Sequence, residues 1–245
     1  MQKFAINLLI KSLIMKEHLE MEKQLAAKEA VKFIKDNQIV GLGTGSTAYY
    51  AMVEIGILIS RGLKIKAVST SNKTSNLAKS LNIPIIDIDQ VTSIDITIDG
   101  TDEFTSDLDL IKGGGGALYQ EKIVASKSKK LIIIADSSKK VDILGKFKLP
   151  IEVEINSFDY VLNQIIAING VGEIRLASNS PYTTDQGNYI IDADFGLINN
   201  PVELSNKLSQ IEGIIGHGLF INLADRVITG YNDSTITYIH KSSLL

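Results

Sequence analysis

Four consecutive glycines, from Gly113 to Gly116, directly follow Lys112 and an apolar pair. Glycine loses more conformational entropy on folding than any other residue, so such a run needs a reason, and close approach of the backbone to a ligand supplies one. We predict that the N–H groups of this run, the positive end of a following helix and the charge of Lys112 surround an oxyanion. The predicted amide donors are Gly113, Gly114, Gly115 and Gly116.

Glu121 comes shortly after these glycines, in the helix that is predicted to follow them. It shares a largely apolar face with Ala117 and Leu118, so its carboxyl can point back toward the loop. Partial desolvation there would raise its pKa toward the value that a general base needs. On an isolated helix, a surface ion pair with Lys122 or a later lysine would be the preferred interpretation. Beside this loop, we interpret Glu121 as the base.

A second glycine-rich turn, from Gly41 to Thr47, leaves a predicted strand and opens a predicted helix. Such a turn brings bare N–H groups and a helix N-terminus to one point, which attracts an anion. The third glycine of a dinucleotide fingerprint would fall at residue 46, which is Ser, and the Gly-Lys-Ser/Thr of a P-loop is missing. We therefore expect a single phosphate monoester, with a tight packing turn as the alternative. The expected phosphate-binding residues are Thr44, Gly45, Ser46 and Thr47.

Asp99, Asp102 and Glu103 fall within five residues at the end of an apolar strand. In a doubly wound sheet, the carboxyl ends of the strands line the ligand crevice, so Asp99 and Asp102 are expected at its rim. Metal binding, hydroxyl recognition and proton relay would each explain two acids, and so would a solvated loop. The three histidines are widely scattered along the chain, so we expect no metal site.

Two lysines are further candidates for binding an anion. Lys139 follows the apolar run 131–135, again at the carboxyl end of a predicted strand, and could reach a phosphate or a sugar hydroxyl. The alternative is one more solvated lysine. Lys23 lies in the first predicted helix and is also a candidate.

These groups are expected on a parallel sheet covered by helices, because helix and strand patterns alternate from Met21 onward. The run 131–135 is the most strand-like and should lie at the centre of the sheet. A helix should begin near Ser71 or Asn72 as its cap and continue through residue 81. The other predicted helices cover 22–35 and 46–60, and the predicted strands cover 38–43, 63–68, 83–88, 94–98 and 131–135.

The order of elements changes after Pro150 to βαββαβ, a split βαβ sandwich. A hairpin over 225–229 and 235–238 then rejoins the first sheet. The predicted fold is therefore α/β, a Rossmann-like mostly parallel sheet with an inserted ferredoxin-like α+β subdomain. The subdomain elements are strand 151–155, helix 158–169, strands 173–177 and 189–193, helix 202–211 and strand 218–222. We place an N-terminal extension at 1–20, the Rossmann-like catalytic domain at 21–147 plus 225–245, and the subdomain at 148–224.

Composition narrows the possible partners. The net charge of −3 is spread over interleaved acids and bases, so no nucleic acid partner is expected. The chain has no cysteine, which excludes disulfides and thiolate nucleophiles and fits a reducing compartment, so we expect a cytoplasmic protein. No apolar stretch approaches the roughly 20 residues of a membrane span, so no membrane partner is expected. Residues 1–20 are expected to form a loose extension or a helical arm used in assembly.

Together, the motifs resemble those of the A-type ribose-5-phosphate isomerases, from about Glu22 to the C-terminus. They are Gly-Thr-Gly-Ser-Thr, Asp-Gly-Thr-Asp-Glu, Lys-Gly-Gly-Gly-Gly-Ala-Leu followed by Glu-Lys-Ile, Ala-Asp-Ser-Ser-Lys-Lys-Val-Asp-Ile-Leu-Gly, and Gly-Asn-Tyr-Ile-Ile-Asp. The resemblance implies interconversion of D-ribose 5-phosphate and D-ribulose 5-phosphate in the non-oxidative pentose phosphate pathway. It also implies a homodimer or homotetramer that uses no cofactor and no metal.

The resemblance also implies a role for each site residue. Glu121 would be the base, assisted by Lys112 and Asp99, and Asp102 would help to hold the sugar. Ser46, Thr47 and the loop 43–45 would bind the phosphate, with Lys139 and Lys23 nearby. In the mechanism that we expect, Asp99 promotes ring opening, and Glu121 moves a proton from C2 to C1 through a cis-enediolate.

Two other functions are considered. A sugar-phosphate-binding sensor would share the architecture, but it needs a DNA-reading module, and the residues before Gly41 are too few and too poorly patterned for one. A nucleotide-dependent oxidoreductase would need the third glycine that the first turn lacks.

Overall fold

In the computed structural model, the backbone is described for residues 2–240 and the side chains for residues 14–240. Residue 1 and residues 241–245, which belong to the predicted extension and the predicted Rossmann-like domain, lie outside the described residues. The largest sheet has six strands in the order β15-β14-β6-β3-β1-β2, and β15 alone runs antiparallel to its neighbour. The strands are β1 (Ile39–Leu42), β2 (Lys66–Ser69), β3 (Ile96–Gly100), β6 (Leu131–Ala135), β14 (Arg226–Tyr231) and β15 (Ser234–Ile239). The mostly parallel sheet and the central place of β6 are confirmed.

The side chains of β6 alternate between two apolar clusters, as they must in a strand buried on both faces. Ile132 and Ile134 pack in the cluster that holds buried residues of α1 (Gln2–Ala30), α2 (Ser46–Ser60) and α3 (Asn72–Ser80). Leu131 and Ile133 pack with Phe220 and with Ala125 of α4 (Leu118–Ser126). The sheet is therefore covered on both faces, which gives its carboxyl edge a rigid frame.

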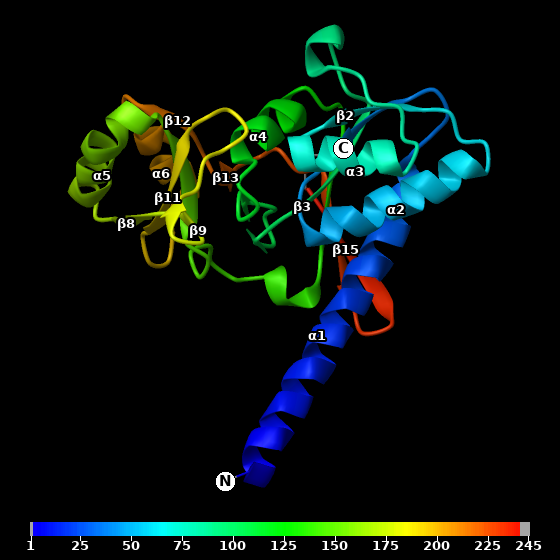
Figure 1. The fold of residues 1–245 in the computed structure, drawn as a ribbon, viewed down its shortest axis with the longest axis horizontal. Coiled ribbons are helices and arrows are strands. Elements are labelled where there is room, and N and C mark those ends of the chain that lie inside the picture. The colour runs from blue at the N-terminus through cyan, green and yellow to red at the C-terminus, as the bar shows by residue number, and fades with distance from the viewer. Residues whose placement is uncertain (1, 241–245) are drawn as a thin grey trace.

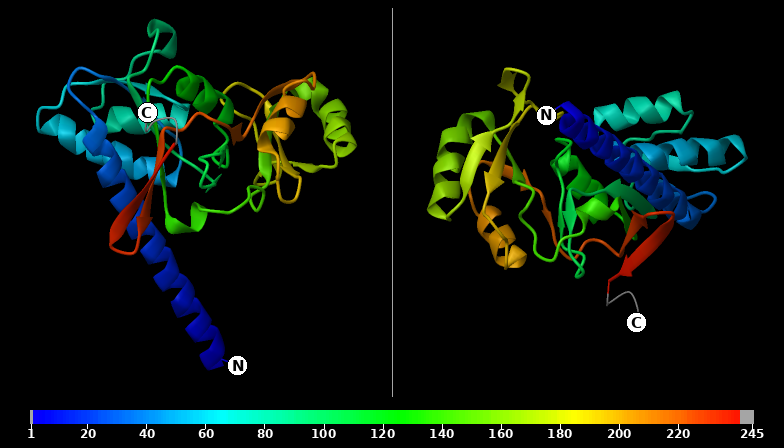
Figure 2. Two further views of the ribbon diagram at one scale, coloured as in Figure 1. Left: turned by 180° about the vertical axis from the view of Figure 1, so that it is seen from behind. Right: turned by 90° about the horizontal axis from the view of Figure 1, so that it is seen from below.

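The first helix is longer than predicted, because α1 begins at Gln2 instead of residue 22 and ends at Ala30, before the 3₁₀ turn η1 (Val31–Phe33). Its C-terminal half packs on α2 and β14, where Ala26, Ala27 and Ala30 are buried. Figures 1 and 2 show its N-terminal half extending away from the rest of the chain. Among the described residues, no helix combines the length and the apolar character that a membrane span needs.

The predicted strand over 83–88 is wrong. Only Ile85 forms an isolated bridge, to Ala67 of β2, and the segment ends in the 3₁₀ turn η2 (Ile88–Gln90). The reason is Pro84, which has no N–H group to donate and leaves its carbonyl to accept the N–H of Ala67 at 2.8 Å. By contrast, the predicted cap of α3 is confirmed, since the Ser71 hydroxyl accepts the N–H of Thr74 at 3.1 Å.

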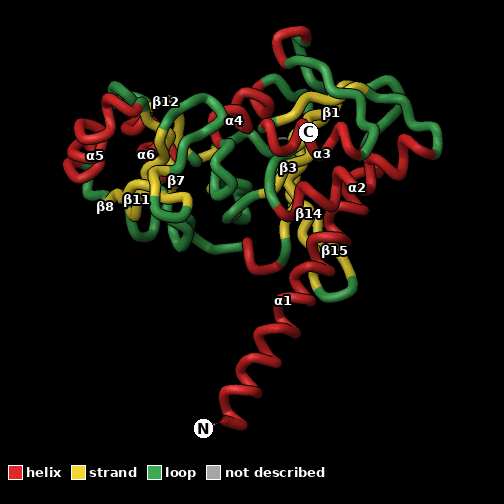
Figure 3. The backbone as a smooth tube through the Cα atoms, viewed as in Figure 1, coloured by secondary structure: helices red, strands yellow, loops and turns green. Residues whose placement is uncertain are grey.

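A second, antiparallel sheet has the order β12-β7-β11-β8. Together with α5 (Phe158–Ala167) and α6 (Pro201–Leu208), it forms the predicted βαββαβ unit. Figure 3 shows these strands grouped apart from those of the parallel sheet. The strands are β7 (Leu149–Val153), β8 (Val171–Ile174), β11 (Tyr189–Asp194) and β12 (Ile214–His217). The 3₁₀ turn η4 (Ile155–Ser157) precedes α5, whereas the 3₁₀ turn η3 (Ser137–Lys139) follows β6 of the parallel sheet. The domain boundaries given above stay a prediction.

The predicted strand over 218–222 is only partly right: a shorter strand forms there, but it is not part of the subdomain sheet, because the chain changes sheets at Gly218. β12 ends at His217, and β13 (Leu219–Phe220) joins a three-stranded sheet with β5 (Leu110–Ile111) and β4 (Glu103–Phe104). Gly218 donates its N–H to the carbonyl of Pro150 and accepts the N–H of Lys112. This small sheet ties the segment before the glycine run to the subdomain. The remaining short strands, β9 (Leu176–Ala177) and β10 (Ser180–Pro181), form a hairpin.

Candidate active site

A cavity of about 80 Å³ lies at the carboxyl ends of β1 and β3, beside the glycine run. It brings together most of the residues that the sequence singled out, from four separate motifs. The lining residues are Thr44, Gly45, Ser46, Thr47, Gly100, Thr101, Asp102, Lys112, Gly113, Gly114, Gly115, Glu121 and Lys139. Gly100 and Thr101 were not predicted, although they belong to the same acidic segment as Asp102.

Glu121 projects from the first turn of α4, and its side chain is only 3% exposed. Its Oε2 atom lies 3.4 Å from Lys112 Nζ and, among the described residues, makes no hydrogen bond. Burial raises the pKa of Glu121 to about 8, with nearby Asp99 adding to the rise and Lys112 opposing it. A carboxyl in this state can take up and release a proton near neutral pH.

Lys112 is the positive centre of the cavity and is also buried. Its Nζ atom lies 3.0 Å from Asp99 Oδ2 and donates to the carbonyl of Gly100 at 2.6 Å. Burial alone would lower the pKa of Lys112, but the charges of Asp99 and Glu121 outweigh it and raise the pKa above its ordinary value. The side chain is therefore an ammonium group at every pH where the protein would be studied.

Asp99 lies beneath the cavity instead of lining it, and its side chain is 2% exposed. Its Oδ1 atom accepts the N–H groups of Gly100 and Thr44, at 2.7 and 3.1 Å. Burial raises the pKa of Asp99, and Lys112 and these two amides oppose the rise. A Cβ atom at Gly43 would lie 2.0 Å from Oδ1, so the glycine at 43 is needed to let this carboxylate approach β1.

The start of α2 provides the predicted anion site. Its cap residue is Gly45, with φ +121°, and no side chain caps the first turn. The free N–H groups and the helix dipole therefore face the cavity beside Ser46 and Thr47. The hydroxyl of Thr44, which was predicted to add a donor, instead lies within 2.8 to 2.9 Å of the hydroxyls of Thr70, Ser71 and Thr74.

The glycine run forms the opposite wall of the cavity. Gly113 and Gly116 have φ values of +102° and +80°, which L side chains rarely adopt. The N–H of Gly114 donates to Asp102 Oδ2 at 2.7 Å, which fixes this carboxylate at the rim. Gly116 does not line the cavity and contacts Tyr182 instead, since a Cβ atom at Gly116 would lie 2.3 Å from the Tyr182 hydroxyl.

Of the two candidate lysines, one lines the cavity and one does not. Lys139, in η3, is among the lining residues. Lys23 does not line the cavity, and its ammonium group instead pairs with Glu20 at 2.8 Å. Glu103, the third acid of its segment, accepts the N–H groups of Gly145 and Phe147 and so supports the following loop. Among the described residues, no cluster of three acidic or histidine side chains could hold a metal ion.

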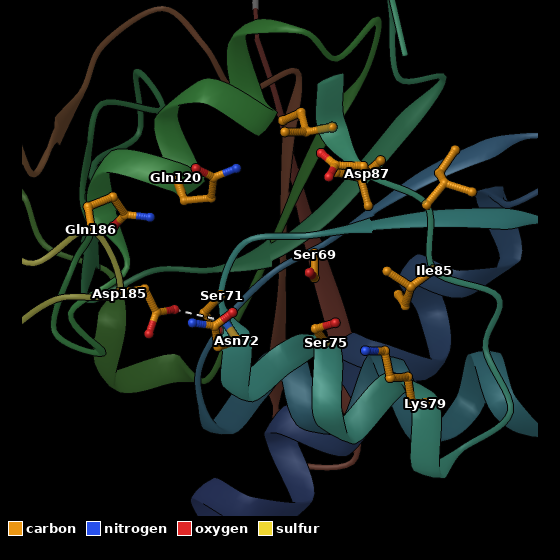
Figure 4. A pocket seen from close by; sticks show the side chains of 13 residues that line it. Ser69, Ser71, Asn72, Ser75, Lys79, Ile85, Asp87, Gln120, Asp185 and Gln186 are labelled. Carbon is orange, nitrogen blue, oxygen red and sulfur yellow. Dashed lines mark hydrogen bonds between the residues drawn. The ribbon is translucent and has the colours of Figure 1, made fainter. Parts of the chain in front are cut away.

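A larger cavity of about 450 Å³ lies at the end of β2, beside α3 (Figure 4). None of the predicted site residues lines it. Asp185, from the loop before β11, accepts the N–H of Asn72 at 2.8 Å there, so the first N–H of α3 already has a carboxylate partner. We place the chemistry in the smaller cavity, because that cavity holds the buried acid, the buried cation and the free amides together.

This arrangement can remove a proton from a carbon next to a carbonyl and stabilise the resulting oxyanion. Glu121 would be the base, while Lys112 and the glycine amides neutralise the negative charge. The start of α2 lies across the same cavity and can hold a phosphate on the same ligand. The geometry thus fits a small phosphorylated carbonyl compound.

Comparison with known proteins agrees with this chemistry. The family model described as ribose 5-phosphate isomerase A (phosphoriboisomerase A) matches residues 66–234. The chain is 45% identical over 217 residues to the ribose-5-phosphate isomerase A of Bacillus mycoides (strain KBAB4), covering 88% of this chain and 98% of that protein. It is 44% identical over 216 residues to the protein of the same name from Streptococcus pneumoniae serotype 4 (strain ATCC BAA-334 / TIGR4), covering 88% of this chain and 95% of that protein.

Solved structures give the same result. The ribose 5-phosphate isomerase from Plasmodium falciparum has a TM-score of 0.88 and 35% identity, covering 91% of this chain and 99% of that chain. A D-ribose-5-phosphate isomerase solved in complex with phospho-erythronic acid has a TM-score of 0.88 and 39% identity, covering 90% of this chain and 99% of that chain.

Proposed function

Since the chain belongs to the ribose 5-phosphate isomerase A family and interconverts D-ribose 5-phosphate and D-ribulose 5-phosphate, we propose that Glu121 moves the proton in this reaction. One observation carries the proposal: a buried carboxyl with a raised pKa has an oxygen that, among the described residues, makes no hydrogen bond, beside a buried ammonium group. The chain matches relatives named ribose-5-phosphate isomerase A over nearly their whole length. These relatives give no support to the alternative of a sugar-phosphate-binding sensor.

The proposed steps follow from the positions of the charges. Asp99 promotes opening of the sugar ring, and Glu121 then takes the proton from C2 of the open aldose. The electron pair of the broken C–H bond forms a C1–C2 double bond, and O1 becomes negatively charged. The hydroxyl proton of the resulting cis-enediolate moves from O2 to O1, and Glu121 returns its proton to C1. The product is the ketose, and the carboxyl is again ionised.

Lys112 and the glycine amides would stabilise the charge that develops on O1 and O2. Donors of this kind contribute about 10²- to 10³-fold each, because they are fixed before the charge appears. One relative was solved in complex with phospho-erythronic acid. Its carboxylate spreads one negative charge over two oxygens, as an enediolate does, which supports an oxyanion cradle in this family.

The phosphate would bind at the start of α2, held by Ser46, Thr47 and the local amides, and Lys139 lines the same cavity. Lys23 would first have to leave its ion pair with Glu20 in order to reach this group. The phosphate is the same in the substrate and in the enediolate. These contacts should therefore serve binding more than the chemical step.

Replacing Ser46 and Thr47 together by alanine tests the phosphate site. We expect KM for ribose 5-phosphate to rise about 10-fold or more while kcat changes by less than about threefold, since uniform binding is lost. Initial rates of ketopentose formation, measured by absorbance over a range of substrate concentrations, give both constants. The exposed Ser60→Ala variant at the far end of α2 is the control. A loss confined to kcat would refute the phosphate assignment.

The pH dependence of kcat/KM tests the proposed base. Glu121 acts only when it is ionised, and its pKa is raised to about 8, so activity should fall as the pH drops through this region. We expect kcat/KM to rise between about pH 7 and 8.5, a range where the substrate phosphate is already largely a dianion, since its second pKa lies near 6. The assay contains a chelator and no added cofactor. A flat profile over this range would argue against a base in this environment.

We also propose that the enzyme works in the cytoplasm as a homodimer or homotetramer. The absence of cysteine supports a reducing compartment. Ile14, Met15 and Met21 are each more than half exposed on α1, and such apolar side chains support self-association. A native mass spectrum of the purified protein measures the number of subunits, and a monomer would overturn the proposed assembly.

A further inference from the structure

Arg175 belongs to the subdomain, but its guanidinium group reaches the glycine run of the catalytic cavity. The residue lies between β8 and β9, and its Nη1 atom donates to the carbonyl oxygens of Gly113 and Gly114, at 2.8 and 3.3 Å. Two of the four glycine peptides are therefore held by one side chain that is 61 to 62 residues away in sequence. No motif in the sequence predicts this contact.

The guanidinium group is itself fixed on its other side. Its Nε atom donates to Asp192 Oδ2 at 2.9 Å, and its Nη2 atom pairs with Asp192 Oδ1. Asp192 lies in β11, which pairs with both β7 and β8. The backbone of Arg175 also donates to the carbonyl of Ile190 at 2.8 Å. A bidentate Arg–carboxylate pair on a strand with two neighbours is a rigid support.

The planarity of the peptide bond turns this support into an effect on the cavity. In a trans peptide, the C=O and the N–H of one unit point in opposite directions. Holding the carbonyls of Gly113 and Gly114 against Arg175 therefore turns the N–H groups of Gly114 and Gly115 the other way. The Gly114 N–H does point inward, since it donates to Asp102 of the cavity rim. The Gly115 backbone lines the same cavity.

Glycine peptides need such a support more than other peptides do. With no Cβ atom, a glycine adopts positive and negative φ about equally well, so the orientation of these peptide units depends on their hydrogen bonds. Besides Arg175, the Gly113 carbonyl accepts the N–H of Gly116 at 3.0 Å, and the Gly114 N–H donates to Asp102. In the structure, the Gly114 carbonyl is held only by Arg175 among the described residues. A flipped unit would present a carbonyl oxygen to the developing oxyanion instead of an N–H group, and the interaction would change from attraction to repulsion.

We infer that Arg175, held by Asp192, is a positioning residue that keeps the glycine amides directed into the cavity. The inference rests on the proposed role of these amides in stabilising the enediolate. Catalysis in the large domain then depends on a side chain from the subdomain that touches no substrate atom.

Replacing Arg175 by methionine tests the inference. We expect kcat to fall about 10- to 100-fold with KM for ribose 5-phosphate within about threefold of the original value, because the phosphate site at α2 is untouched. Arg175→Lys keeps the charge, but a lysine cannot bridge two carbonyls and a carboxylate. This variant should therefore retain less than about a tenth of the original kcat. Arg61→Met, at the exposed end of α2, is the matched control and should turn over normally.

Asp192→Asn separates positioning from general loss of structure. This variant keeps Arg175 but weakens its support, so a smaller loss of kcat, about 3- to 10-fold, is expected. The double variant should be no slower than Arg175→Met alone, because both changes act on the same contact. Near-normal kcat in Arg175→Met, an effect on KM alone, or additive losses in the double variant would overturn the inference.

If Arg175→Met does not fold, Arg175→Lys and Asp192→Asn decide the question by the same criteria. The proposed role of Glu121 is tested separately. Full activity in a Glu121 variant would overturn that role, whereas the Arg175 variants test only the positioning of the glycine amides.

Discussion

The Glu121→Gln variant is expected to lose on the order of 10³-fold in kcat, since a positioned general base contributes about 10²- to 10⁴-fold. Glutamine has nearly the same shape and can still accept hydrogen bonds, but it cannot take a proton from C2. KM for ribose 5-phosphate and the affinity for phospho-erythronic acid should stay within about threefold of their original values, because neither depends on proton transfer. Initial rates and an equilibrium titration measure these quantities.

The stability of this variant distinguishes a lost base from a damaged fold. Burial raises the pKa of Glu121, so its ionisation destabilises the folded chain as the pH rises above the ordinary range of a carboxyl. Glutamine has no such cost, and the Tm of Glu121→Gln at pH 8 should equal or exceed that of the original protein. Near-normal kcat in a variant that folds in this way would refute the assignment.

Glu152→Gln is the matched control for this experiment. Glu152 is also fully buried, burial also raises its pKa, and its Oε2 atom makes no hydrogen bond within the described residues. It lies in β7 and does not line the catalytic cavity. We expect its kcat to stay within about threefold of the original value, which would show that a buried Glu→Gln change does not by itself stop turnover.

The Lys112→Met variant is expected to lose about 10²- to 10³-fold in kcat/KM. The buried Lys112 ammonium group lies 3.4 Å from Glu121 Oε2, and it has two roles in the proposed mechanism. We propose that it stabilises the oxyanion, and it lowers the pKa of Glu121 against the effect of burial. Without it, the pKa of Glu121 should rise further, so the acid limb of the kcat/KM profile should move to higher pH. Rate measurements from about pH 6.5 to 10 detect both changes.

Lys112→Met should also reduce stability, because it leaves the buried Asp99 without its cation. Removing one partner of a buried ion pair costs about 3–5 kcal/mol, which chemical denaturation can measure. Lys129→Met, whose ammonium group pairs with Asp95 at the surface, is the control and should change neither quantity appreciably. If Lys112→Met retained more than about a third of the original kcat/KM and the acid limb did not move, the proposed role of Lys112 would be wrong.

Local sequence signals predicted most of the residues that line the candidate cavity. The glycine-rich turn, the acidic segment and the glycine run each stand next to an apolar strand, and parallel strands bring their carboxyl ends to one edge. Once β1, β3 and β6 are recognised, Ser46, Asp102 and Lys139 must therefore approach one another. Glu121 joins them because α4 begins directly after the glycine run.

Contacts between distant segments could not be predicted in this way. Arg175 resembles any other arginine at the edge of a strand until the subdomain is placed beside the glycine run. The hydroxyl of Thr44 turns toward Thr70 and Thr74 because the end of β2 and the start of α3 lie beside it, and a phosphate-binding threonine would look the same in sequence.

Two errors in the predicted fold have equally local causes. The apolar run around Ile85 has the composition of a strand, but Pro84 removes a donor from it. The run after His217 is continuous in sequence, whereas its hydrogen bonds change from β7 to β5 at Gly218. Hydrophobic pattern gives the burial of such a segment but not the partner with which it pairs.

Isomerisation in D₂O tests the proton shuttle most directly. If Glu121 carries the proton, its carboxyl can exchange with solvent while the enediolate is bound, so ribulose 5-phosphate formed early in the reaction should carry deuterium at C1. Proton NMR of the product measures this label, and Glu121→Gln should form labelled product on the order of 10³-fold more slowly than the original protein. Labelled ketose formed by Glu121→Gln at the rate of the original protein would contradict the proposed mechanism, because a group other than Glu121 would then be moving the proton.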